Sequence, residues 1–125
     1  MNPVQDPEIY VFVTLSPEDL SDALLRAARG MFCEDEGISL ILPQQTAQAH
    51  GLTFAAAPAM SRITLSVHSA LDGVGLTAAV AGALAAQGIA CNMVAAYHHD
   101  HVFVPLEQTD QALQILSDLQ TRHQV

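Results

Sequence analysis

The fold is decided by residues 62–89, which read RITLSVHSALDGVGLTAAVAGALAAQGI. Apolar and polar residues alternate over 62–68, and this period of two predicts a strand with one buried face. A turn over 69–74 leads into a predicted helix over 75–87, which Gly88 ends. The apolar stripe that this helix has to bury against a sheet consists of Leu76, Val80 and Leu84.

Two strands and a helix complete this second half of the chain. Strands are predicted over 89–96 and 102–105, on either side of a polar cluster. Thr109 is predicted to cap the last helix. Its apolar residues recur at helical spacing and share one face: Ala112, Ile115, Leu116 and Leu119.

The first half of the chain shows the same order of elements. A strand is predicted over 9–15, followed by a helix that Ser16 caps and Gly30 stops. Two short hairpin strands and a second short helix follow, over 31–34, 38–42 and 43–51. Identities at matching places support a duplication with an offset of about sixty residues. They are Gly30-x-x-Cys33 with Gly88-x-x-Cys91, Pro43 with Pro105, and Gln45-Thr-x-Gln-Ala49 with Gln108-Thr-x-Gln-Ala112.

The order strand, helix, strand, strand, helix in each half predicts the fold class. It is α+β, built from two ferredoxin-like βαββα(β) repeats in which helices cover one face of an antiparallel sheet. The Ala- and Pro-rich stretch 55–59 is the best place for a connection. We therefore expect an N-terminal repeat over 1–58 and a C-terminal repeat over 59–125.

The composition excludes several functional classes. Half of the residues are hydrophobic (50%) and 14% are charged, so 125 residues can bury the core of one compact domain or of two small units. Four arginines and no lysine stand against thirteen acidic residues, which gives a net charge of −9. This charge repels phosphate backbones and anionic lipids, so we expect neither nucleic-acid nor membrane binding. Without lysine, the chain has no Schiff-base chemistry and no P-loop.

Targeting signals and cysteine usage indicate a cytoplasmic protein. The first residues contain no basic segment followed by an apolar run, so no secretory signal is expected. The longest weakly polar stretch, 74–86, is shorter than the roughly 20 residues that a membrane span needs. Cys33 and Cys91 lack the spacing of a zinc knuckle or a redox pair, and we expect them to be buried thiols.

The stretch 72–89 resembles a known family, the ACT domains. Their pattern runs from an acid and a Pro-Gly-Leu turn through an alanine- and valine-rich helix to Gly-Ile-Asn. Val74 replaces the usual proline, and Cys91 replaces the usual asparagine, with Asn92 one position later. The matching residues are Gly75, Leu76, Val80, Gly82, Ala83, Leu84, Gly88 and Ile89. The whole chain looks like the short bacterial tandem-ACT proteins of uncharacterised function, through the phrases at 33–43, 63–69 and 99–105.

The resemblance implies a small effector, usually an amino acid, bound between two ACT units. The residues agree with this, because Gly73 and Gly75 allow close backbone approach and the helix start offers unpaired amides to a carboxylate. Asp72 can meet an ammonium group, and Thr77 or Asn92 can add hydrogen bonds. The structural alternative is that the glycines only form a tight turn and Asp72 only caps the helix. The candidate ligand-binding residues are Asp72, Gly73, Val74, Gly75, Leu76, Thr77 and Asn92.

The polar cluster His98–His101 is the other candidate site. Alternate residues of a strand share a face, so His99 and His101 can act together. A metal site needs further ligands, which His50 or His68 would have to supply from elsewhere in the chain. We expect a solvated polar hairpin without a metal. The alternative is a metal-binding protein, or a small metal-dependent enzyme, that uses this hairpin.

The predicted function is regulatory and not catalytic. No nucleophile with a recognisable base and no cofactor motif is visible, so we expect no enzyme activity and no cofactor. A small-molecule effector, in the first place an amino acid, is the expected ligand. Exposed sheet edges favour a homodimer or a higher homo-oligomer. A purely structural interaction module is the third alternative.

Overall fold

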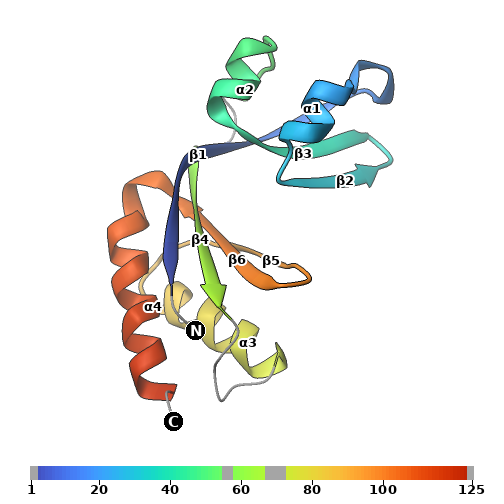
Figure 1. Cartoon of the computed structure of the whole chain (residues 1–125). Helices are drawn as coiled ribbons and strands as arrows, with labels where there is room; N and C mark the ends of the chain where they lie inside the picture. The colour runs from blue at the N-terminus through green and yellow to red at the C-terminus, as the bar shows by residue number, and fades with distance from the viewer. Residues whose placement is uncertain (1–2, 55–57, 67–72, 124–125) are drawn as a thin grey trace. The chain divides into compact units, whose positions relative to one another are not determined.

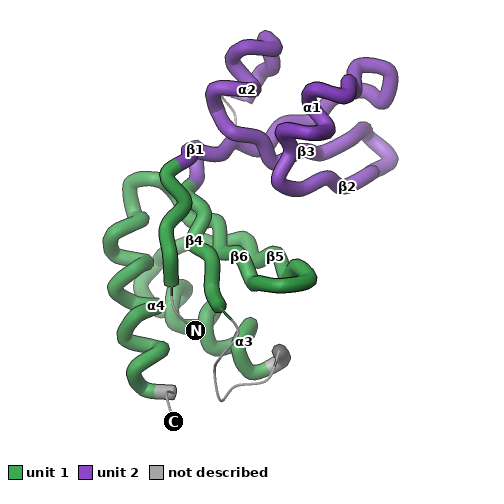
Figure 2. The backbone as a smooth tube through the Cα atoms, in the orientation of Figure 1, with its two compact units in different colours: residues 1–7, 61–125 green, residues 8–60 purple. Residues whose placement is uncertain are grey.

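The computed structural model describes residues 3–54, 58–66 and 73–123, which form strands and helices in the order that Figure 1 shows. Contacts between residues group the chain into two compact units, which Figure 2 shows in different colours. The 8–60 unit comprises Glu8–Met60, and the 61–125 unit comprises Ser61–Val125 together with Met1–Pro7. No helix in the described part of the chain is long and apolar enough to cross a membrane.

The 8–60 unit is a sheet with two short helices (Figure 1). Its described strands follow the order β2-β3-β1. The central strand β3 pairs antiparallel with both neighbours, with Leu40 opposite Val13 of β1 and Ser39 opposite Phe32 of β2. Its elements are most of β1 (Val4–Leu15), the 3-10 helix η1 (Pro17–Asp19), α1 (Asp22–Ala27), β2 (Gly30–Glu34), β3 (Gly37–Pro43) and α2 (Gln44–Ala49).

The core of the 8–60 unit lies between one face of its sheet and the two helices. Alternate residues of a strand share a face, and the buried set on this face is Val11, Val13, Leu15, Ile38, Leu40 and Leu42. Leu24 of α1 and Ala47 of α2 belong to the same cluster. Both helices therefore cover the same face, and the strands predicted over 9–15 and 38–42 are confirmed.

The first predicted helix is wrong in its beginning. The chain forms η1 after Ser16, then Leu20 takes an extended conformation (φ −73°, ψ 124°) and interrupts the helix. Ser16 makes no side-chain cap, whereas the Ser21 hydroxyl accepts a hydrogen bond from the Leu24 N–H at 3.2 Å. Ser16 and Ser21 were both available as caps. The helix that begins after Ser21 places Leu24 in the core beside the sheet. Gly30, predicted to stop the helix, opens β2 instead.

The 61–125 unit has two longer helices, which pack against each other (Figure 1). Its strands follow the order β1-β4-β6-β5, with the first residues of β1 at one edge. β5 and β6 form an antiparallel hairpin in which Val94 lies opposite His101. The elements are β4 (Met60–Ser66), α3 (Gly73–Ala86), β5 (Asn92–Ala95), β6 (His99–Pro105), the 3-10 helix η2 (Leu106–Gln108) and α4 (Thr109–His123).

The predicted apolar stripes of α3 and α4 form the core of this unit. The stripe of α3, Leu76, Val80 and Leu84, is buried together with residues of α4: Ala112, Leu116 and Leu119. The sheet contributes alternate residues of its strands: Ile63, Leu65, Val102 and Val104. Ile115, the remaining predicted member of the α4 stripe, is partly buried against this cluster. The helices thus cover one face, and the residues between these strand positions lie on the helix-free face.

Thr109 does not cap α4 as predicted. The preceding helix η2 runs directly into α4, so Thr109 is already helical (φ −60°, ψ −48°). Its hydroxyl donates to the Leu106 carbonyl at 2.7 Å. Because a hydroxyl carries one proton, the buried Ser61 hydroxyl must be the donor in the 2.5 Å contact with Thr109. The pair satisfies two buried polar groups inside the core.

The hairpin strands of this unit have different limits from those predicted. β5 begins at Asn92 instead of residue 89, because Gly88 turns the chain at φ +72° and Ile89 then fills the core. β6 begins at His99 instead of residue 102. His99 and His101, predicted for a polar cluster between the strands, therefore extend β6, whereas His98 lies in the bend before it.

The prediction of buried thiols is wrong for Cys33. This residue is exposed, since β2 is an edge strand whose residues after Gly30 are all exposed. Cys91 is half-buried, and burial raises the pKa of its thiol. Both cysteines are free.

Candidate functional site

The predicted glycine turn before α3 is helical in its last part. α3 begins at Gly73, so Gly73, Val74 and Gly75 belong to its first turn. Asp72 lies outside the described residues. Thr77 is exposed one turn further along the helix. Of the predicted site, the structure thus provides the first turn of a helix of 14 residues.

Leu76 and Asn92 differ from the rest of the predicted site. Leu76 is 1% exposed and packs in the core, so only its backbone can reach a ligand. Asn92 is exposed and pairs with Phe103 across the hairpin.

Asn92 follows α3 in the chain. The helix spans about 21 Å at 1.5 Å per residue. The Ile89 N–H is held to the Leu84 carbonyl at 3.0 Å, at the far end of the helix. Asn92 follows three residues later, as the first residue of β5.

A groove of about 860 Å³ lies in the 8–60 unit, at the loop that follows β1. We call it the loop groove. Its apolar lining is Leu15, Leu24 and Leu52, of which the first two are buried. Its polar lining includes Ser16, Asp19, Ser21, His50 and Thr53, all exposed. A carboxylate, an imidazole and several hydroxyls therefore surround an apolar floor.

Two chain reversals position the lining of the loop groove. On one side, the loop from Ser16 to Ser21 follows β1 and leads into α1. On the other, α2 ends in a Schellman motif, in which Gly51 takes φ +67° and the Leu52 N–H donates to the Ala47 carbonyl at 2.9 Å. This motif places His50 and Leu52 at the groove.

Sequence reasoning missed the loop groove. Its lining comes from residues 14–24 and 50–53, which are distant in the chain and form no motif. One signal was available: in the duplication, the loop after the first strand of the first half corresponds to the glycine loop before Gly75. The site proposed before Gly75 in the second repeat thus pointed to the corresponding loop of the first repeat, where the loop groove lies.

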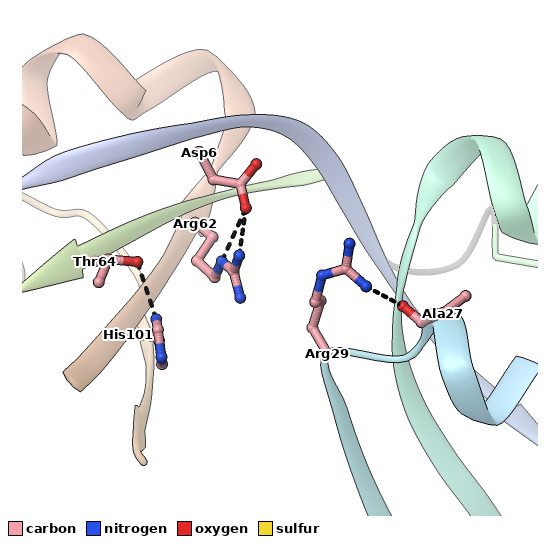
Figure 3. A network of polar contacts seen from close by, with 6 residues as sticks. All are labelled: Asp6, Ala27, Arg29, Arg62, Thr64 and His101. Atoms are coloured by element: carbon pink, nitrogen blue, oxygen red, sulfur yellow. Dashed lines mark hydrogen bonds and ion pairs between the residues drawn. The ribbon is translucent and has the colours of Figure 1, made fainter. Parts of the chain in front are cut away.

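A polar network lies on the helix-free face of the 61–125 unit (Figure 3). The Arg62 guanidinium forms an ion pair with the Asp6 carboxylate, with a 3.1 Å hydrogen bond from Nε. Next to Arg62 on the same face of β4, the Thr64 hydroxyl lies 3.0 Å from Nδ1 of His101 on β6. Burial lowers the pKa of His101, and the neighbouring Arg62 and His99 lower it further, against the opposite effect of Asp100 and Asp6.

In the β5–β6 hairpin, each aromatic ring from Tyr97 to His101 lies near the next one along the chain. Tyr97 is 96% exposed and meets His98 edge to face at 4.8 Å between ring centroids. The His98 and His99 rings are 6.3 Å apart, and the His99 and His101 rings 6.5 Å apart. Among the residues described, no group of three or more His, Cys, Asp or Glu side chains is arranged to hold a metal ion.

Comparisons with known proteins identify the family. Two models of the ACT domain match the chain, one over residues 1–58 and the other over residues 61–118. A comparison with curated proteins found no match.

Solved structures with the same fold include one of high sequence identity. A Vibrio cholerae protein of unknown function, described as a possible transport protein, is 43% identical, with a TM-score of 0.82 over 94% of this chain and 88% of that one. An Agrobacterium tumefaciens protein is 18% identical, with a TM-score of 0.65 over 90% of this chain and 83% of that one. The ligand-free regulatory subunit of aspartate kinase from Thermus thermophilus is 11% identical, with a TM-score of 0.66 over 94% and 95% of the two chains.

These matches confirm the α+β fold of two ferredoxin-like repeats. Tandem matches to one domain cover both halves, and the likeness to the aspartate kinase subunit extends over nearly the whole chain. The chain therefore belongs to the ACT domain family.

Proposed function

We propose that this protein is a non-catalytic regulatory module that binds a small effector, in the first place an amino acid. The loop groove carries the proposal, because it combines an apolar floor with one carboxylate and several hydrogen-bonding groups. Membership of the ACT family supports a regulatory role, since ACT domains are regulatory. The likeness to a regulatory subunit of aspartate kinase agrees with it.

The lining of the loop groove suits a zwitterion with an apolar side chain. Asp19 can accept from an ammonium group, while the Ser16 hydroxyl and the His50 imidazole can donate to a carboxylate. The leucines then contact the apolar part of the ligand. A volume of about 860 Å³ lies within the roughly 300–1,000 Å³ range of small-molecule sites.

The second repeat offers the corresponding position at the start of α3. The residues proposed to bind a second effector are Asp72, Gly73, Val74, Gly75, Leu76 and Thr77. We propose that Asn92, which is exposed, adds a hydrogen bond to such a site.

Three further proposals describe the protein as a whole. Residues 1–58 and 59–125 are the two sequence repeats, and the chain acts as a homodimer or a higher homo-oligomer. Its partner is the effector, without nucleic acid or membrane, in keeping with the net charge of −9. Its location is the cytoplasm.

A thermal-shift screen of the twenty amino acids tests the proposed function. A ligand specific for the folded state at a hundred times its dissociation constant adds about 2.7 kcal/mol, which for a chain of this size raises the Tm by roughly 8 to 16 °C. At least one amino acid should produce such a shift. If all twenty leave the melting curve unmoved at millimolar concentration, the proposed effector class is wrong. The result would then favour the alternative of a purely structural interaction module.

A further inference from the structure

We propose that His99 and His101 form a binding site for a divalent transition-metal ion on the helix-free face of the 61–125 unit. This site is separate from the loop groove and does not depend on effector binding. It rests on three features of the hairpin: the position of the two histidines on one strand face, the fixed orientation of one ring, and the balance of charge around them.

The two histidines share a face because β6 begins at His99. Residues two apart in a strand point to the same side of the sheet. Their ring centroids are 6.5 Å apart. With metal–nitrogen bonds of 2.0–2.1 Å, two imidazoles on one tetrahedral ion have their centres about 5 Å apart. His99 is exposed, so a rotation of its side chain closes this difference without moving the strand.

His101 is already held in the orientation that a metal ligand needs. Its Nδ1 lies 3.0 Å from the Thr64 hydroxyl, so Nε2 is the ring nitrogen that faces away from β4 (Figure 3). When Nδ1–H donates to Thr64, Nε2 carries the free lone pair. Metal-ligating histidines use such a second hydrogen bond to fix the tautomer and the ring. Thr64 is therefore assigned a positioning role.

The charges around the pair permit a cation. Arg62 is the cation near His101, and its ion pair with Asp6 neutralises part of that charge. Asp100 adds a negative charge between the two histidines in the sequence.

The ligand set indicates the class of ion. Two imidazoles suit Zn²⁺, Ni²⁺ and Cu²⁺ and disfavour Mg²⁺ and Ca²⁺, which prefer oxygen ligands. Across the hairpin, the residue opposite His101 is Val94, which offers no side-chain ligand. Water completes the coordination, so the site exchanges its ion readily.

Calorimetry with Zn²⁺ and Ni²⁺ on the untagged, chelator-treated protein tests the site. Saturable binding of one ion per chain is expected at neutral pH, with no binding of Mg²⁺. Loss of even an outer partner of a metal ligand costs about 10–100-fold in affinity, so His99→Ala should weaken binding by at least about tenfold. Thr64→Val should weaken it as well, although this side chain does not touch the ion.

His98→Ala is the matched control, since His98 is an exposed neighbour of the pair. It should leave the affinity nearly unchanged, as should His50→Ala in the other unit. An unchanged Tm without metal shows that each variant is folded, and the exposed position of His99 makes this expected. The proposal is overturned if the protein shows no saturable binding, if His99→Ala binds like the wild type, or if His98→Ala loses as much as His99→Ala.

Discussion

At Ser21, a single hydroxyl serves both α1 and the loop groove. It accepts a hydrogen bond from the Leu24 N–H, so Ser21→Ala should lower the free energy of unfolding by about 0.5–2 kcal/mol. Ser16→Ala is the control, because Ser16 caps nothing, and its effect should stay within about 0.5 kcal/mol. Urea denaturation measures both. Equal losses for the two variants would contradict the assignment of the cap.

Asp19 is the residue on which amino-acid recognition depends in the proposed function. Its carboxylate is the acid in the lining of the loop groove, so Asp19→Ala should abolish the ligand-induced rise in Tm. Glu18→Ala removes a neighbouring acid of η1 that is not part of the lining, and it should leave the shift intact. Both side chains are exposed, so neither variant should lose its fold. A full shift with Asp19→Ala would move the effector to another site.

Gly51 and Gly82 differ in backbone conformation, because Gly51 is left-handed after α2 and Gly82 lies inside α3. Gly51 ends α2 at φ +67°, where a side chain costs about 1–2 kcal/mol, so Gly51→Ala should destabilise the protein. Gly82 lies inside α3, and an added Cβ would meet nothing within 4 Å. Gly82→Ala should therefore stabilise the protein by about 0.5–1 kcal/mol. Urea denaturation of the two variants should give changes of opposite sign, and changes of the same sign would contradict this account.

Local patterns predicted the elements well and their ends poorly. The stripes of α3 and α4 were correct because helical spacing of apolar residues is a property of the segment itself. β6 starts early, at His99, because its first residues pair with β5. The helix is interrupted at Leu20, and this break depends on the packing of Leu24 against the sheet. Exposure of Cys33 depends on β2 being an edge. Pairing and edges arise between segments, so no local pattern contains them.

For the candidate site, the sequence pointed to the loop before Gly75, which stays a prediction, and the structure adds a groove at the corresponding loop of the other repeat. Glycines made the loop before Gly75 conspicuous, whereas the loop groove is lined by ordinary residues such as Ser16, Asp19 and His50. A groove assembled from distant segments leaves no motif. The duplication in the sequence was the signal that related the loop after Leu15 to the loop before Gly75.

The whole molecule is expected to self-associate through its sheet edge. Phe32 is 72% exposed and Met31 is 47% exposed on β2, the edge strand of the 8–60 unit. An apolar, unpaired edge is a template for a second copy. Light scattering should therefore report more than the 13.3 kDa of one chain, and Phe32→Glu should lower the measured mass. A mass of one chain at all concentrations, with and without effector, would contradict the proposal.

The strand β1 belongs to both units, and this has a consequence for biosynthesis. Its first residues belong to the 61–125 unit, where Asp6 forms an ion pair with Arg62, while its later residues pair with β3 in the 8–60 unit. These first residues leave the ribosome before β4 exists and must wait for it to be translated. Two separately expressed halves, cut between 58 and 59, would give the second half without its edge strand. Adding the first half back, or a peptide that carries only Val4–Pro7, would then test whether these few residues complete a sheet whose other strands are translated after the whole 8–60 unit.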